Sequence, residues 1–145
     1  MKSRLLILAI ALVLAFALIT TFALEGDEVG VLRTRGGDAP DGIRYTRVWY
    51  AEDGARLWIE SADHARPFLE DLRREPRIVL EHDGALRAYV AEVQPNPEGH
   101  QQIRRLLAEK YGWRDLWVGL LTDTSGSLGI VLTPPTRSPT PPPAH

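Results

Sequence analysis

The sequence of 145 residues contains no cysteine. This absence excludes disulfide bonds, thiolate metal sites and cysteine nucleophiles, so the fold must be stabilised by packing alone. An excess of positive charge is also missing from the chain beyond its first 24 residues. Residues 25–145 hold 15 of the 17 basic side chains and all 19 acidic ones, a net charge of −4 with neutral histidines. We therefore expect no binding of nucleic acid through bulk charge.

Catalytic and metal-binding motifs are scarce as well. Ser125 has no GxSxG nucleophile elbow around it and no evident histidine partner, which argues against a hydrolase. Three histidines lie too far apart in the sequence to indicate a metal set, namely His64, His82 and His100. His82 stands beside a predicted tight turn, where a solvated histidine is ordinary. The sequence therefore predicts no metal site and assigns no catalytic residue.

One long apolar segment stands near the N-terminus. The twenty residues Leu5–Leu24 carry no charge, and as a helix they would extend about 30 Å, the thickness of the hydrocarbon core of a bilayer. Lys2 and Arg4 precede this segment, and three acidic residues follow it within 25–28. Since flanking positive charge stays in the cytoplasm, we expect a single-pass membrane protein whose soluble domain is extracytoplasmic.

A cleaved secretory signal is the alternative interpretation of the same segment. Thr21–Ala23 offers small residues that a signal peptidase could recognise. The apolar core of a signal peptide usually has about 7–15 residues, however, and this run is longer. The length favours an uncleaved anchor over residues 1–24.

The remainder of the chain divides into one domain and a tail. Residues 25–133 are enough for a single compact core. Residues 134–145 are rich in proline, threonine and serine, and we expect them to be a disordered tail that samples extended conformations.

Short runs of alternating and β-branched residues predict six strands in the soluble domain. Asp-Gly pairs at 53–54 and 83–84 predict tight turns between neighbouring strands. The strands are expected at Val29–Arg35, Ile43–Ala51, Ala55–Ser61, Arg77–His82, Ala85–Gln94 and Leu128–Leu132.

A change to helical spacing between the third and fourth strands predicts an amphipathic helix at Asp63–Glu75. Phe68 is among its apolar residues, and Asp71 is expected on its outer face. Ser61 or Asp63 is the expected N-cap.

Two further helical segments follow the fifth strand. Glu98–Tyr111 has helical apolar spacing and ends before Gly112, and Trp113–Leu121 is an aromatic and leucine-rich second piece. This order of elements predicts an α+β fold, a small six-stranded and mostly antiparallel split β-barrel with two to three helices, preceded by one transmembrane helix.

Residues 46–84 contain a strand ending in a polar turn, a helix with Phe68 and Leu72, and the step Glu75–Ile78 into the next strand. This arrangement resembles the split β-barrel family, which includes flavin-binding oxidases of the pyridoxamine-phosphate type and deazaflavin-dependent nitroreductases. The resemblance covers nearly the whole soluble domain. Two later blocks share it, Lys110–Asp115 and Gly119–Asp123.

The resemblance implies FMN or a deazaflavin as cofactor and no metal. In such families, basic and hydroxyl residues on the second and third strands and at the helix start hold the cofactor phosphate. Arg44 and Arg47 both match by position, but they fall on opposite faces of their strand, and Arg47 is the preferred one. The candidate cofactor-binding residues are Thr46, Arg47, Ser61, His64 and Arg66.

The chemistry of the residues gives an independent reason for a phosphate site. Backbone N–H groups at a helix start attract anions, and Arg66 and Arg47 could add charge-assisted hydrogen bonds. In the alternative interpretation, Ser61 or Asp63 only caps the helix, and Arg66 pairs with Glu70 one turn later.

Two functions remain open on the sequence. The first is a membrane-tethered flavin- or deazaflavin-dependent oxidoreductase that reduces a nitro or quinone acceptor. The second is a non-catalytic ligand-binding or interaction domain of the cell envelope, because the charge bias places the domain away from the cytoplasmic pools of reduced nicotinamide and deazaflavin. The resemblance also implies a homodimer, in which the Trp113–Leu121 segment could be buried.

Overall fold

A computed structural model describes residues 2–24, 29–36, 38 and 40–135. The acidic residues that follow the apolar segment lie outside the described residues. The same holds for residues 136–145, which make up most of the tail expected at 134–145.

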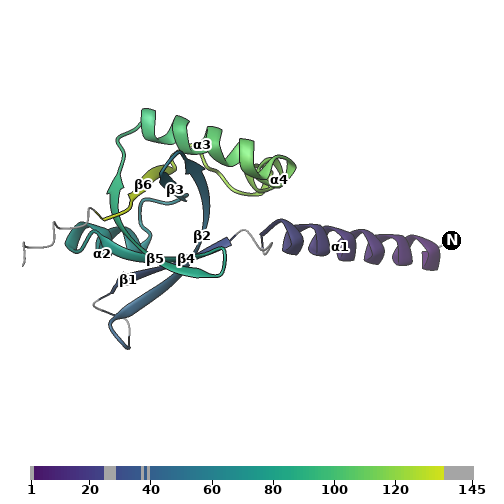
Figure 1. The fold of residues 1–145 in the computed structure, drawn as a ribbon. Coiled ribbons are helices and arrows are strands. Elements are labelled where there is room, and N and C mark those ends of the chain that lie inside the picture. The colour runs from purple at the N-terminus through teal and green to yellow at the C-terminus, as the bar shows by residue number, and fades with distance from the viewer. Residues whose placement is uncertain (1, 25–28, 37, 39, 136–145) are drawn as a thin grey trace, which may run out of the picture.

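The described residues form four helices and six strands (Figure 1). The helices are α1 (Lys2–Leu24), α2 (Pro67–Arg74), α3 (Glu98–Tyr111) and α4 (Trp113–Leu121). The strands are β1 (Val29–Arg35), β2 (Ile43–Asp53), β3 (Arg56–Ser61), β4 (Arg77–His82), β5 (Ala85–Val93) and β6 (Leu128–Thr133).

The strands close into an antiparallel barrel in the order β1-β2-β3-β6-β5-β4, and β1 also pairs with β4. The predicted α+β barrel with a preceding apolar helix is therefore confirmed. The turn predicted at Asp83-Gly84 is confirmed too, because both residues have positive φ, 50° and 70°, as a two-residue type I′ hairpin requires.

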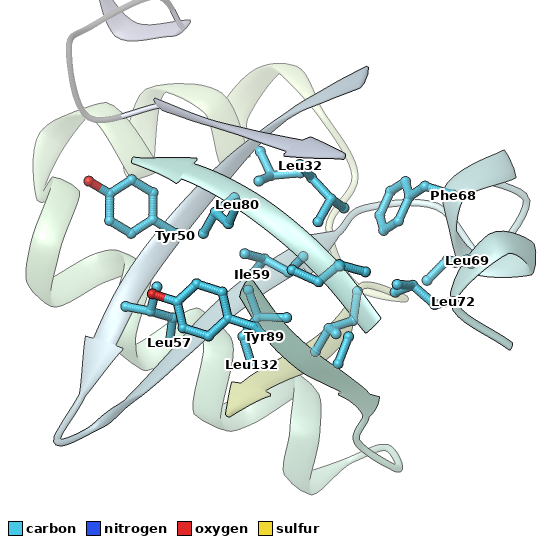
Figure 2. Close-up of a cluster of buried hydrophobic side chains, with 14 residues drawn as sticks. Leu32, Tyr50, Leu57, Ile59, Phe68, Leu69, Leu72, Leu80, Tyr89 and Leu132 are labelled. Carbon is cyan, nitrogen blue, oxygen red and sulfur yellow. The ribbon is translucent and has the colours of Figure 1, made fainter. Parts of the chain in front are cut away.

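Alternate residues of the strands fill the interior of the barrel (Figure 2). Leu32, Ile59 and Leu80 are fully inaccessible to solvent there. The helix α2 closes one end of the barrel and inserts Phe68 and Leu69 toward this core. The barrel is thus packed with side chains and has no central channel.

The start of α2 differs from the prediction. The helix begins at Pro67, and its N-cap Arg66 makes no side-chain capping hydrogen bond. Ser61 Oγ donates to the Asp63 carbonyl, and Asp63 Oδ1 accepts from the Ala65 N–H, both at 2.8 Å. The predicted cap is therefore wrong, because these polar side chains stabilise the turn before the helix instead.

The helix α3 covers the outside of the barrel over β2, β3 and β6 (Figure 1). Its buried residues include Ile103, Leu107 and Tyr111, which pack with Trp58 and others. A Cβ on Gly129 of β6 would collide with the carbonyl of Gly99, so the start of α3 approaches the strand as closely as backbone allows.

The helix α1 projects away from the barrel (Figure 1). Its segment Arg4–Ala23 is long and apolar enough to cross a membrane. Next to its C-terminal end lies α4, which follows α3 after the sharp corner at Gly112.

Candidate functional site

The barrel has an opening between β2 and β3. These strands pair only from Tyr50 with Ile59 to Asp53 with Arg56. The earlier residues of β2 pair with β1, and the end of β3 pairs with β6. The separation leaves a pocket of about 350 Å³, which is at the small end of the range for ligand sites. It is lined by Val29, Thr46, Arg47, Val48, Trp49, Glu60, Ser61, Ala62, Arg66, Phe68 and Val118.

Four of the five predicted site residues line this one pocket. Thr46 and Arg47 come from β2, Ser61 ends β3, and Arg66 precedes α2. Thr46 lies on the face of β2 whose next members, such as Val48, enter the barrel core, whereas Arg47 lies on the opposite face. The separation of the two strands is what allows residues of both faces to line the same pocket.

Arg66 and Ser61 differ in their surroundings. Ser61 is only 2% exposed, and its hydroxyl donates to Asp63 within its own turn. Arg66 is exposed, and no carboxylate of the described residues forms an ion pair with it. The expected pairing with Glu70 is wrong, because Glu70 accepts from Arg73 and Arg74 on the next turn.

His64 is separated from the other four. It does not line the pocket, and its Nε2 lies 2.5 Å from the carbonyl oxygen of Gly126. The imidazole ring is therefore hydrogen-bonded to the loop before β6.

Arg44 has a structural role at the end of the barrel that α2 closes. Its Nε donates to Asp71 Oδ2 at 2.8 Å, and Thr34 Oγ1 donates to the same oxygen at 2.8 Å. The hydrogen bond that Arg44 donates to Asp71 raises the pKa of Arg44 above its ordinary value, against the effect of desolvation. Asp71 is only 2% exposed, so its expected place on the outer face of the helix is wrong. The three side chains attach α2 to β1 and β2.

The one acidic residue lining the pocket, Glu60, is paired with a cation of α3 that it shares with Asp115. Arg104 donates to both oxygens of Glu60 at 3.2 Å and to both oxygens of Asp115 at 2.7 Å. Burial lowers the pKa of Arg104, but the charges of Glu60 and Asp115 outweigh burial and leave the pKa raised. This bridge could not be predicted from the sequence, because Arg104 is separated from Glu60 by 44 residues and from Asp115 by 11.

The aromatic wall of the pocket is Trp49. Its ring stacks on Tyr111 of α3 with centroids 4.5 Å apart and an angle of 18° between the planes. Trp58 is buried beneath α3 instead. One tryptophan of the barrel therefore borders the pocket.

A second cluster of polar side chains, at the β4–β5 hairpin, could not be predicted from the sequence. His82 is 5% exposed, so the expectation of a solvated histidine is wrong. Its Nδ1 lies 2.9 Å from Asp83 and its Nε2 lies 2.9 Å from the hydroxyl of Tyr89. Tyr50 donates to Asp83 at 2.8 Å, and burial followed by this contact raises the pKa of Tyr50 well above its usual range. Across the described residues, no three His, Asp or Glu side chains are grouped as a metal site.

Comparison with known proteins places this geometry in a fold. No family model and no curated protein matches the chain. A Listeria innocua protein described as a pyridoxamine 5′-phosphate oxidase superposes with a TM-score of 0.53 and 19% identity over 77% of this chain and 87% of that chain. A FAD-binding protein of Mesorhizobium loti superposes with a TM-score of 0.54 and 19% identity, over 82% of this chain and 89% of that chain. An F420 reductase superposes with a TM-score of 0.52 and 22% identity, over 79% of this chain and 92% of that chain.

The chain has the split-barrel fold. The closed order of its six strands and the three solved structures agree on this architecture, and the predicted resemblance is confirmed at that level. At these identities the likeness concerns the fold alone.

Proposed function

We propose that the pocket between β2 and β3 binds the phosphate of FMN or of a deazaflavin, and that the protein is an oxidoreductase tethered to the membrane by α1. The guanidinium groups of Arg47 and Arg66 would pair with the phosphate, and the hydroxyl of Thr46 would add a hydrogen bond, while Ser61 donates to Asp63 and holds the turn that borders the pocket. The observation that carries this proposal is that these four residues, from three parts of the chain, line one pocket.

The donor set of the pocket fits a phosphate group. Two guanidinium groups border it, and the carboxylate of Glu60 pairs with Arg104, which Glu60 shares with Asp115. The start of α2 adds the positive end of a helix dipole. A phosphate in this pocket would therefore find cationic donors on two of its sides. His64 has no part in this set, because it lies outside the pocket lining.

The cofactor would supply hydride transfer, here to a nitro or quinone acceptor. The chain itself would bind and orient the cofactor. Arg47 and Arg66 would hold its phosphate, and Trp49 would form an apolar wall of the pocket. No nucleophile or general base is required from the protein for such a reaction. Fold relatives described as FAD-binding and as an F420 reductase support this reaction class.

The test is titration of the full chain in detergent with FMN and with F420, followed by cofactor fluorescence. Arg66→Ala removes charge-assisted hydrogen bonds of about 1.5–3 kcal/mol, so we expect an affinity loss of roughly ten- to a hundredfold. Arg73→Ala is the matched control, because Arg73 lies on the outer side of α2 and pairs with Glu70. Equal losses in both variants, or a folded protein that binds neither cofactor, would refute the proposal.

A non-catalytic ligand-binding domain is the second candidate. Lys2 and Arg4 precede the apolar segment, which favours an extracytoplasmic barrel away from cytoplasmic electron donors. A topology reporter fused after His145 distinguishes the two functions. An outward reporter together with cofactor-free protein supports the binding domain, and an inward reporter supports the oxidoreductase.

A further inference from the structure

The helix α4 leaves its apolar face uncovered. Trp113 is 52% exposed, Leu116 72% and Leu120 80%, and Leu121 is also exposed. Spacings of three and four residues place Trp113, Leu116 and Leu120 on one face of the helix, and Leu121 borders that face. Only Asp115 of α4 is buried. A face of this composition on a soluble protein would be left in water at considerable cost.

The same helix lies against the last turns of α1. Trp117 Nε1 donates to Thr20 Oγ1 at 3.2 Å, and the ring of Trp117 lies 5.4 Å from that of Phe16. Trp113 stacks on Phe22 with an angle of 6° between the planes. The contacts thus extend along α1 from Phe22 back to Phe16.

These contacts set the depth of α4. At about 1.5 Å rise per residue, Phe16 lies roughly 10 Å before Ala23 along the axis of α1. If α1 spans a bilayer, a side chain beside Phe16 lies inside the hydrocarbon region. Interfacial helices insert their apolar face by about 5–10 Å, which matches this depth.

The polar side of α4 points the opposite way. Arg114 Nε and Nη2 donate to the carbonyl oxygen of Ala23 at 3.1 and 3.0 Å, at the C-terminal end of α1. This pairing of a cation with the negative end of a helix is favourable. Asp115 is held by Arg104 on the barrel side. The polar residues therefore face the barrel and the end of the anchor, and the leucines face away from both.

We infer that α4 is an interfacial membrane helix, whose leucines and tryptophans contact the acyl chains of the leaflet that holds the C-terminal end of α1. The inference rests on the membrane anchoring in the proposed function. Tryptophan at the level of the headgroups is typical of such positions. Because Val118 of α4 also lines the pocket, the pocket lies next to lipid.

The test uses single cysteines, which the cysteine-free chain accepts without background labelling. Leu120→Cys is labelled with a fluorescent nitrobenzoxadiazole, and the full chain is reconstituted in phosphatidylcholine and phosphatidylglycerol vesicles. Ile43→Cys is the control, since Ile43 is an exposed apolar residue that pairs with the last residue of β1, at the end of the hairpin away from the anchor. We expect nitroxide-labelled lipids to quench the label at position 120 severalfold more than the label at 43, and aqueous iodide to do the reverse.

Two results at position 120 would overturn the inference. Quenching by iodide equal to that at position 43 would mean that the face lies in water. Protection from both lipid nitroxide and iodide would mean that protein, such as a second copy of the chain, covers it.

A third label separates this inference from the anchor itself. Leu12→Cys lies at the middle of α1 and is 63% exposed in the chain. If lipid nitroxide quenches position 12 but not position 120, α1 spans the membrane and only the inference on α4 fails. If position 12 is not quenched, or is lost from the mature chain by cleavage, the anchoring fails and the inference with it. Titration with FMN or F420 tests cofactor binding in the pocket independently of the labels at positions 12 and 120.

Discussion

The helices α3 and α4 follow each other in the chain, and they differ in what their apolar faces meet. The helix α3 buries Ile103, Leu107 and Tyr111 against the outside of the barrel. The helix α4 has its leucines exposed and a carboxylate buried. Apolar periodicity thus predicts that a helical face will be covered, but the nature of the cover depends on the position of the helix in space.

Gly112 produces the difference between the two helices. Its φ of 54° lies in the region that favours glycine, and its N–H bonds to the carbonyl of Ala108 at 3.0 Å, which ends α3. The chain then turns away from the barrel, and α4 reaches α1. A continuous helix would have carried the leucines of α4 along the direction of α3.

The largest effect is expected from Leu107→Ala. Leu107 of α3 is fully buried against the barrel, so the variant should lose about 2–5 kcal/mol of unfolding free energy through lost burial and the remaining cavity. Leu120→Ala on α4 should change it by less than about 0.5 kcal/mol. Urea unfolding of the detergent-solubilised chain, followed by tryptophan fluorescence, measures both.

This pair of variants can contradict the comparison. A loss at Leu120 as large as that at Leu107 would mean that α4 packs on protein in a way similar to α3. The contrast between the two helices would then not hold.

An intermediate effect is expected at the bridge that joins the two helices. Arg104→Met leaves Asp115, which is 4% exposed, without its cation, and breaking a buried pair in this way costs about 3–5 kcal/mol, less here because the guanidinium is partly exposed. Arg105→Met is the control, since its pair with Glu109 is exposed and worth at most about 1 kcal/mol. The same urea assay applies, and similar values for both variants would show that the bridge does not join α3 to α4.

The strands and turns of this barrel could be predicted from the sequence, because their signals are local. The Asp83-Gly84 turn and the β-rich run of β1 need no information from distant residues. The pocket was partly predictable for a different reason. A resemblance selected Arg47 and Arg66, and strand alternation separated Arg47 from Arg44.

What the sequence did not reveal depends on distant contacts. Asp71 looks like a surface residue of an amphipathic helix, and only Thr34 and Arg44 from two strands make its burial favourable. His82 stands beside a turn, yet Tyr89 across the hairpin encloses it. The sequence can identify ionisable residues, but whether they are buried is decided by partners that the fold brings to them.

The smallest effect concerns Asp83, beside the C-terminal turn of α3, where Lys110 Nζ lies 3.6 Å from the ring centroid of Tyr50. Hydrogen bonds from Tyr50 and then His82 lower the pKa of Asp83 in the folded chain. A lowered folded pKa contributes stability above the unfolded value of about 4, and this contribution disappears as the pH falls through the folded pKa. The wild-type chain should therefore lose stability below about pH 4 more steeply than Asp83→Asn.

Tyr50→Phe provides the second arm of this measurement, because it keeps the ring in the core and removes the hydroxyl that donates to Asp83. The pKa of Asp83 should then rise toward its ordinary value, and the acid loss should become shallower, as in Asp83→Asn. Urea midpoints from about pH 3 to pH 7, a range that includes the ordinary carboxylate pKa of about 4, give the comparison. Identical acid profiles in all three chains would mean that the carboxylate of Asp83 is solvated in the folded state and makes no net contribution to its stability.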